Sequence, residues 1–430
     1  MSRVEELKER VLRKAAELSD EVVRLCSELV KVPSENPPGD MSEVASLITD
    51  WLGEHGLTAE RYEPVKGAIN LLVKVGDQEK PCLALNGHMD VVPAGDRARW
   101  SFDPYSGEVR DGKVLGRGAT DMKGGLACLL TALVAVVQAV EHIPGTLLLA
   151  AVPDEETGGE HGTKWLVEQG KLYGDACLMG EPSGIRACMV AEKGVCWLRL
   201  RAKGVPAHGS LPALGENAVE KMAKAMEVIK RVEEMEVHLP PELAGVLEAS
   251  RAFFREGLSV SGLPAEKVEA AVEALDHVTV NFGVIKGGTK VNVVPDACEL
   301  EVDIRVPPGL TPSEAKARVE ELLRAEGLGD VECEFIQASE PNYTPPTASI
   351  YRLVEANARE LTGIEVKPIL ITGGTDARFL RTKGVPSVHY GPGELTRAHA
   401  YDEFVETEHL VIATRVLAGT MFDFIYGRII

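Results

Sequence analysis

Two residues that can bind a metal or move protons, His88 and Asp90, follow a short apolar stretch, Leu83–Leu85, that ends at Asn86-Gly87. Such a stretch is typical of the end of a buried strand. In an extended chain the side chains of residues i and i+2 point to the same side, so His88 and Asp90 can face one point. A carboxylate behind a histidine fixes its tautomer and raises its basicity, as in metal sites. The alternative is a polar turn with a solvated histidine and aspartate.

Four further polar clusters lie in Gly-rich loops or at the ends of expected strands, namely Asp121, the pair Glu155 and Glu156, Glu181, and His399. Loops at the carboxyl ends of parallel strands are where open α/β sheets bind ligands. Taken singly, each cluster also fits a solvated acidic loop or a surface histidine. With His88 they supply nitrogen and oxygen ligands that suit zinc, cobalt or manganese. The set is large enough for two metal ions that share one carboxylate.

Apolar stretches that alternate with helix-periodic segments predict the elements that carry these residues. Asn70–Val75, Cys82–Leu85 and Thr146–Val152 are predicted strands, and Leu126–Val140 is a predicted buried core helix. Strands that alternate with helices predict an α/β domain with a largely parallel sheet. The stretch Leu126–Val140 is shorter than the roughly 20 residues that span a membrane.

A different pattern begins near residue 190. A strand, a helix, two strands, a helix and a strand follow one another, which is the order of the split-βαβ, ferredoxin-like sandwich. These elements are predicted at 196–202, 217–234, 278–285, 297–306, 312–326 and 331–336, with an extra helical insertion at 240–276. The α/β pattern resumes near Pro345. The sequence therefore predicts one domain formed by residues 1–189 and 341–430, and a second domain, residues 190–340, inserted into it.

Composition narrows the classes of partner. The formal net charge is −20 over 430 residues, which argues against binding of nucleic acid or of an anionic membrane, since both need a basic face. The eight cysteines show no Cys-x-x-Cys spacing, as expected for free thiols of a reducing compartment such as the cytoplasm. Residues 1–18 are charged and helix-periodic, and they lack the apolar core of a signal peptide.

Five motifs in order resemble those of the acetylornithine deacetylase / succinyl-diaminopimelate desuccinylase / aminoacylase family of co-catalytic zinc amidohydrolases, whose relatives include carboxypeptidase G-like enzymes and dipeptidases. The motifs are Gly87-His88-Met89-Asp90, Gly118-Ala119-Thr120-Asp121-Met122-Lys123-Gly124, Asp154-Glu155-Glu156, Gly180-Glu181-Pro182-Ser183 and Ala398-His399. The resemblance covers nearly the whole chain. It implies a mostly parallel-sheet catalytic domain that binds metal, and an inserted ferredoxin-like domain that serves as a lid and as the contact of a homodimer.

The resemblance also implies a set of metal ligands. Asp121 would bridge two divalent metal ions, which are expected to be zinc, with cobalt or manganese as alternatives. His88 and Glu181 would complete one metal site, and Glu156 and His399 the other.

Two residues have implied catalytic roles: Asp90 orients His88 from behind, and Glu155 is the general base. A pair of metal ions lowers the pKa of a bound water towards about 7, and Glu155 passes the water's proton to the leaving nitrogen of an amide. Neighbouring residues of an extended chain point in opposite directions, so Glu155 can face the substrate while Glu156 faces a metal. The family also has a cis peptide bond after its bridging aspartate, here between Asp121 and Met122.

Three residues of the inserted domain resemble substrate-binding residues of the family. His208 resembles a histidine that reaches across a dimer to stabilise the oxyanion, a role typically worth about 2.7–4 kcal/mol. Asn292 and Arg305 resemble residues that hold the substrate, and an arginine fork suits the α-carboxylate of an N-acyl amino acid. The alternatives are a surface histidine, an asparagine in a turn at a strand end, and an arginine paired with an acid such as Asp303.

Together these resemblances imply a metal-dependent amidohydrolase that cleaves the linear amide bond of a small N-acyl amino acid, as deacetylases and desuccinylases do, and the cysteine pattern predicts that it is cytoplasmic. The nearest alternative is a dipeptidase or carboxypeptidase with the same catalytic residues. A metal-binding protein without activity is a further alternative, although no residue of the expected set is missing from the sequence.

Overall fold

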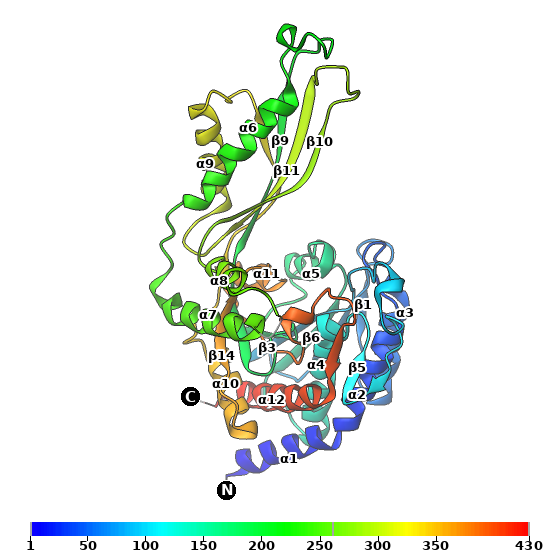
Figure 1. The fold of residues 1–430 in the computed structure, drawn as a ribbon. Helices are drawn as coiled ribbons and strands as arrows, with labels where there is room; N and C mark the ends of the chain where they lie inside the picture. The colour runs from blue at the N-terminus through cyan, green and yellow to red at the C-terminus, as the bar shows by residue number, and fades with distance from the viewer. Residues whose placement is uncertain (1, 260–261, 429–430) are drawn as a thin grey trace. The chain divides into compact units, whose positions relative to one another are not determined.

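The computed structural model describes residues 2–259 and 262–428 (Figure 1). The chain divides into two compact units. Unit 1 contains Met1–Val190, Thr344–Ile369 and Thr375–Ile430, and unit 2 contains Ala191–Tyr343 and Leu370–Gly374. The chain therefore completes most of unit 1, forms unit 2, and then returns to unit 1.

The main β-sheet is mixed, and its centre is parallel. Its strands are β1 (Glu60–Tyr62), β2 (Asn70–Val75), β3 (Cys82–His88), β6 (Thr146–Val152), β7 (Ala176–Met179), β8 (Ala187–Glu192), β13 (Asn342–Tyr343), β14 (Lys367–Ile371) and β15 (Ser387–His389). They lie in the order β1-β2-β6-β3-β7-β15-β8-β13, and β14 pairs with β8. The neighbours β6, β3, β7 and β15 run parallel, whereas β2 and β8 flank them in antiparallel register. The predicted α/β architecture is confirmed.

Helices cover both faces of this sheet, so its central strands are buried along their whole length and are mostly apolar. On one face α4 (Gly124–Ala139) packs against α1 (Arg3–Glu17), α2 (Ser19–Lys31) and α12 (Thr407–Ile425). On the other face α5 (Thr163–Glu168) and α11 (Ala377–Arg381) contribute side chains to a core cluster with β6 and β7. The helices α3 (Ser42–Glu54) and α10 (Ser349–Thr362) complete the unit.

One helical stretch in the described part of the chain, Ala119–Ala139, is long and apolar enough to cross a membrane. Its most apolar portion is 89% buried inside the protein. It contains α4, which lies among other helices and against the sheet. The prediction of a buried core helix over Leu126–Val140 is therefore confirmed.

Unit 2 contains a four-stranded antiparallel sheet with two helices on one face. The strands β9 (Gly194–Lys203), β10 (Thr279–Gly287), β11 (Ala297–Val306) and β12 (Glu332–Ser339) lie in the order β10-β11-β9-β12. The helices α6 (Ala218–Lys230) and α9 (Pro312–Ala325) bury their apolar faces against it. This is the predicted ferredoxin-like sandwich, and α7 (Ala244–Ser259) and α8 (Ala265–Glu273) form the additional helical insertion.

A small third sheet joins two segments that are far apart in the sequence. The strands β4 (Val109–Arg110) and β5 (Lys113–Leu115) form a hairpin, and β16 (Phe404–Glu406) pairs with β5. The sheet therefore places the segment that leads to Asp121 beside the segment that follows His399.

Candidate metal centre

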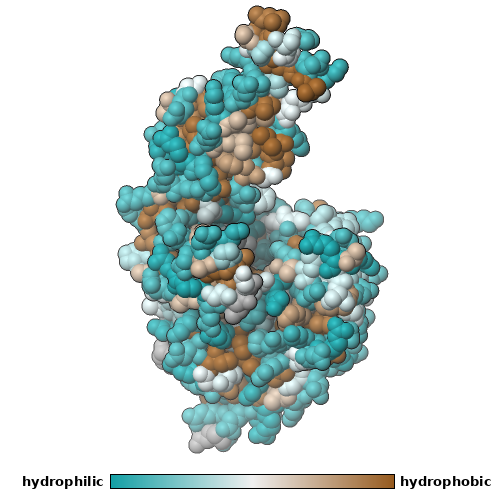
Figure 2. All heavy atoms as spheres, viewed as in Figure 1, coloured by the Kyte–Doolittle hydropathy of each residue, from teal (hydrophilic) through white to brown (hydrophobic). Residues whose placement is uncertain are grey.

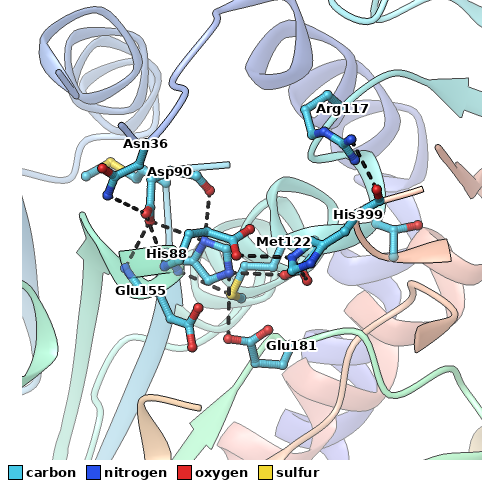
Figure 3. A network of polar contacts seen from close by, with 12 residues as sticks. Asn36, His88, Asp90, Arg117, Met122, Glu155, Glu181 and His399 are labelled. Carbon is cyan, nitrogen blue, oxygen red and sulfur yellow. Dashed lines mark hydrogen bonds and ion pairs between the residues drawn. The ribbon is translucent and has the colours of Figure 1, made fainter. Parts of the chain in front are cut away.

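Five polar residues from distant parts of unit 1 come together beyond the carboxyl ends of the parallel strands. His88 is the last residue of β3, while Glu156 follows β6 and Glu181 follows β7. Asp121 lies just before α4, and His399 lies in the loop before β16. Figure 3 shows His88 and His399 pointing toward each other, with Glu181 directed at the same region. The site therefore occupies the edge where open α/β sheets bind ligands.

Asp121 lies between the two histidines and presents one oxygen to each. His88 Nε2 lies 3.1 Å from Asp121 Oδ1 and 3.7 Å from Glu181 Oε1. His399 Nε2 lies 3.4 Å from Asp121 Oδ2 and 3.1 Å from Glu156 Oε2. The residues thus form two sets, His88 with Glu181 and His399 with Glu156, which share Asp121. All five residues for which the sequence predicted metal binding lie together in this arrangement.

The donor atoms fit divalent cations. The ligand atoms of His88, Asp121 and Glu156 lie within 4.8 Å of one another, and so do those of His88, Glu155 and Glu181. Glu156 Oε1 is buried, and within the described residues it has no hydrogen-bond partner. Because a buried, unpaired charged oxygen is costly, the site favours a cation as its partner. Imidazole nitrogens combined with carboxylate oxygens suit zinc, cobalt or manganese.

The ionisation of these groups also indicates a cation site. Burial raises the pKa values of Glu155, Glu156 and Glu181, and repulsion between neighbouring carboxylates adds to this effect. Burial disfavours charged His88, but nearby carboxylates, Glu181 foremost, outweigh it and raise the pKa of this imidazole well above its ordinary value. Hydrogen bonds to Asp121 and Glu156 raise the pKa of His399 to about 10. The site thus attracts positive charge, and a bound metal ion would displace protons from its ligands.

Asp90 supports both His88 and the acidic turn beside it. The backbone carbonyl oxygen of Asp90 lies 2.9 Å from His88 Nδ1, and its Oδ1 lies 3.4 Å from the same nitrogen. Its two carboxylate oxygens accept hydrogen bonds from the backbone N–H groups of Glu155 and Glu156, each at 3.2 Å. One aspartate thus orients a histidine, chiefly through its main chain, and holds the neighbouring glutamates through its side chain.

Glu155 and Glu156 lie in a 3₁₀ turn, η3 (Glu155–Thr157), rather than in the extended chain that the sequence analysis assumed. That assumption is wrong because Asp154 adopts a left-handed conformation (φ 60°) and the carboxylate of Asp90 binds two successive N–H groups. Successive side chains of a 3₁₀ helix diverge by about 120°. The two glutamates still point in different directions, but for a different geometric reason.

Asn36 contributes to the site and was not identified from the sequence. Its Nδ2 donates hydrogen bonds to Asp90 Oδ2 and Thr157 Oγ1, both at 3.0 Å (Figure 3). It lies in the proline-rich segment 33–40. An asparagine beside prolines is typical of a solvated turn, so local sequence offered no signal for its burial.

A close backbone approach sets the distance between the Asp121 segment and Glu181. A Cβ atom at Gly125 would lie 1.7 Å from the carbonyl oxygen of Gly180. Only glycine therefore allows α4 to begin against the end of β7, directly before Glu181. The peptide bond between Asp121 and Met122 is cis, as the resemblance implied.

The three candidate residues of unit 2 do not form one cluster. His208 pairs with Val293 in an isolated β-bridge, and Gly209 N–H donates to the carbonyl of Asn292, so the two loops lie side by side. Arg305 lies near the opposite end of β11, eight residues beyond Ala297, or about 27 Å at the rise of a strand. Its guanidinium donates to both carboxylate oxygens of Asp303 at 2.8 and 3.1 Å. In the structure Arg305 therefore pairs with Asp303, which is the alternative given in the sequence analysis.

We expect divalent cations to stabilise the chelator-treated protein, because they would neutralise buried carboxylates. Zinc, cobalt or manganese at about 100 times its dissociation constant would contribute roughly 2.7 kcal/mol and raise the melting temperature by a few degrees. Differential scanning fluorimetry measures this shift. Magnesium serves as the control and should have less effect, since it prefers all-oxygen ligands. An unchanged melting temperature with all three transition-series ions would contradict a metal centre.

Residues 84–423 match the profile of Peptidase family M20/M25/M40. The sequence is 29% identical over 394 residues to a probable succinyl-diaminopimelate desuccinylase of Staphylococcus epidermidis, covering 90% of this chain and 93% of that protein. It is 26% identical over 441 residues to an N-formyl-4-amino-5-aminomethyl-2-methylpyrimidine deformylase of Bacillus subtilis, covering 94% of this chain and 95% of that protein.

The fold is shared with a solved structure. The M20 family metallo-carboxypeptidase Sso-CP2 of Sulfolobus solfataricus superposes with a TM-score of 0.77 at 20% sequence identity, covering 94% of this chain and 99% of that one. At this level of identity the likeness shows a common fold.

Proposed function

Because the chain belongs to Peptidase family M20/M25/M40, we propose that it is a metal-dependent hydrolase that cleaves the amide bond of a small N-acyl amino acid at a pair of divalent ions. The observation that carries this proposal is the position of Asp121, which presents one carboxylate oxygen to His88 and the other to His399. A carboxylate in that position can bridge two ions. Zinc fits this ligand set, and cobalt and manganese are alternatives.

The residues of the chain have distinct parts in the proposed reaction. Bound divalent ions polarise a carbonyl oxygen and lower the pKa of a water molecule. Glu155, in η3 beside the ligands, accepts the proton of the attacking water and delivers it to the leaving nitrogen. Asp90 holds His88 in orientation and fixes the backbone of Glu155. These groups are positioned before substrate arrives, which reduces the reorganisation that the reaction requires.

Three curated or structural relatives bear on the choice of substrate. Two sequence relatives, each matched over most of its length, are named as a probable desuccinylase and a deformylase, and both names describe removal of an acyl group from nitrogen. We therefore favour a deacylase of the deacetylase/desuccinylase type. A dipeptidase or carboxypeptidase is the alternative, since the same residues would hydrolyse a peptide bond and a metallo-carboxypeptidase shares the fold.

The inserted unit is proposed to be a lid and a homodimer contact. Large apolar side chains are exposed on it, namely Val205, Leu211, Leu214, Val291 and Val293, and Figure 2 shows apolar atoms gathered at the end of this unit. His208 Nδ1 accepts a hydrogen bond from Ser210 N–H at 3.2 Å, so in the neutral ring the proton is on Nε2. That N–H, on an exposed side chain, suits donation to an oxyanion, with Asn292 beside it and Arg305 as a second candidate contact for substrate.

We propose that the enzyme works in the cytoplasm. All eight cysteines lie within the described residues, and each is a free thiol; all but Cys333 are buried. Unpaired thiols are typical of proteins kept in a reducing compartment.

The proposal predicts metal-dependent release of an amine from an N-acyl amino acid. Protein treated with a chelator and then supplied with zinc or cobalt is assayed against acetyl-ornithine, succinyl-diaminopimelate, N-formyl amino acids and a panel of dipeptides. We expect the largest kcat/KM for an acylated amino acid, and no turnover while the chelator is present. A preference for dipeptides would favour the alternative, and failure to hydrolyse any amide after metal addition would contradict the proposal.

A further inference from the structure

A buried ion pair lies next to the candidate metal centre, and neither of its residues has a part in the proposed reaction. Arg117 follows β5, and Glu403 precedes β16, so the small third sheet brings the two residues together. Both side chains are buried, and Arg117 Nη1 donates to Glu403 Oε2. The Arg117 guanidinium also lies 5.2 Å from the ring of Trp100. Neither residue was assigned a role from the sequence.

Arg117 binds the backbone of the His399 loop. Its Nη2 donates to the carbonyl oxygen of His399 at 3.4 Å, and its Nη1 donates to that of Ala400 at 3.2 Å (Figure 3). His399 has φ 61°, a left-handed conformation that is unfavourable for a residue with a side chain. Its side chain is 53% exposed. Because the imidazole is only half covered, its position depends on how the backbone is held as well as on its contacts with Asp121 and Glu156.

Glu403 binds the backbone of the Asp121 segment. Its Oε1 accepts hydrogen bonds from Thr120 N–H at 2.9 Å and from Asp121 N–H at 3.1 Å. One carboxylate thus contacts Arg117 through one oxygen and the residue proposed to bridge the ions through the other. The ion pair links the backbones of two metal ligands, Asp121 and His399, that are far apart in the sequence.

We propose that Arg117 and Glu403 are positioning residues, which set the separation of His399 from Asp121 and thereby the affinity of the metal ion bound by His399 and Glu156. The inference rests on the proposed function, because it presumes that these residues bind metal. The ion at His88 and Glu181 depends less on the pair, since β3 and β7 carry its ligands. A buried ion pair adds little stability when compared with apolar residues of similar size. The hydrogen bonds of this pair, in contrast, fix the backbone positions of Asp121 and His399.

Two variants of the pair test this proposal by metal affinity. Arg117→Lys keeps the charge but loses the fork that reaches two carbonyl groups, and Glu403→Gln keeps the shape but loses the charge. Each chelator-treated protein is titrated with cobalt(II) against a competing chelator, with visible absorption as the readout. We expect one of the two ions to bind about 10 to 100 times more weakly in each variant, the usual effect of losing a group that orients a ligand.

A double-mutant cycle separates positioning from general stability. If Arg117 acts through His399, Arg117→Lys should cause no further loss of cobalt affinity in the His399→Ala background. Asp423→Asn is the matched control: Asp423 is a buried carboxylate of unit 1 paired with Lys8 and Arg428. Its loss should lower the melting temperature and leave both cobalt affinities unchanged.

Two results would overturn the proposal. One is an Arg117→Lys protein that melts earlier, as the Asp423 control does, yet binds both ions as the parent does. The other is an equal loss of affinity in the His399→Ala background. If Arg117→Lys does not fold, Glu403→Gln carries the same test. If the parent protein bound no cobalt, the proposed function itself would be contradicted. Failure of the positioning role and failure of the proposed function are therefore distinguishable.

Discussion

The Glu155→Gln variant is expected to bind both metal ions and to lose about 10²–10⁴-fold in kcat, the usual contribution of a general acid–base. Glutamine has nearly the shape of glutamate, and it can still accept a hydrogen bond, but it cannot take a proton from water. The backbone N–H of Glu155 is bound by Asp90 and does not depend on the side chain. The turn should therefore keep its conformation while proton transfer is lost.

Metal content by mass spectrometry and kcat on the preferred substrate test this expectation together. Glu160→Gln is a matched control, because Glu160 is an exposed glutamate of the same loop that pairs with Lys164. It should keep near-normal turnover. Near-normal turnover in Glu155→Gln would refute the general-base role. Loss of one ion would instead make Glu155 a ligand, which its proximity to His88 and Glu181 would allow.

The Asp121→Asn variant is expected to lose both ions and, with them, all measurable hydrolysis. Asp121 presents one carboxylate oxygen to each of the two histidines. An amide has one acceptor oxygen and no charge, so it cannot present a separate oxygen to each of two cations and does not neutralise them. The loss of affinity should exceed the roughly 10- to 100-fold that follows removal of a group that merely orients a ligand.

Isothermal titration of the chelator-treated protein with zinc measures the stoichiometry directly. Asp111→Asn is the control, since Asp111 is an exposed aspartate at positive φ (51°) that asparagine readily adopts. It should bind as the parent does. Two ions bound tightly in Asp121→Asn would show that the carboxylate does not bridge, and a single lost ion would assign Asp121 to one site alone.

Much of the fold was predictable because its determinants are local. The strands predicted at Asn70–Val75, Thr146–Val152 and Ala297–Val306 have the bounds of β2, β6 and β11. Continuous apolar runs mark strands buried on both faces, and alternating polar and apolar residues mark β11, which is buried on one face. The order of the elements in the inserted unit then limited its topology to the ferredoxin-like sheet.

The conformation of the acidic turn was less predictable. Alternation of side chains in an extended chain accounted for the different directions of Glu155 and Glu156, yet these residues form a 3₁₀ turn. The turn is bound by Asp90, which lies some 65 residues earlier. No local sequence pattern predicts a hydrogen bond between residues so far apart in the sequence.

The sequence by itself determined which chemical groups this protein has and on which elements they lie. Residue types and the ends of apolar strands singled out His88, Asp121, the pair Glu155 and Glu156, Glu181 and His399 as candidates, and the family resemblance divided them into expected metal ligands and an expected general base. Only the tertiary structure decided which groups hold them: Asn36 behind Asp90, and the Arg117–Glu403 pair beneath Asp121 and His399. The physical reason is that a hydrogen bond between distant segments depends on their separation in space, which the packing of whole elements sets.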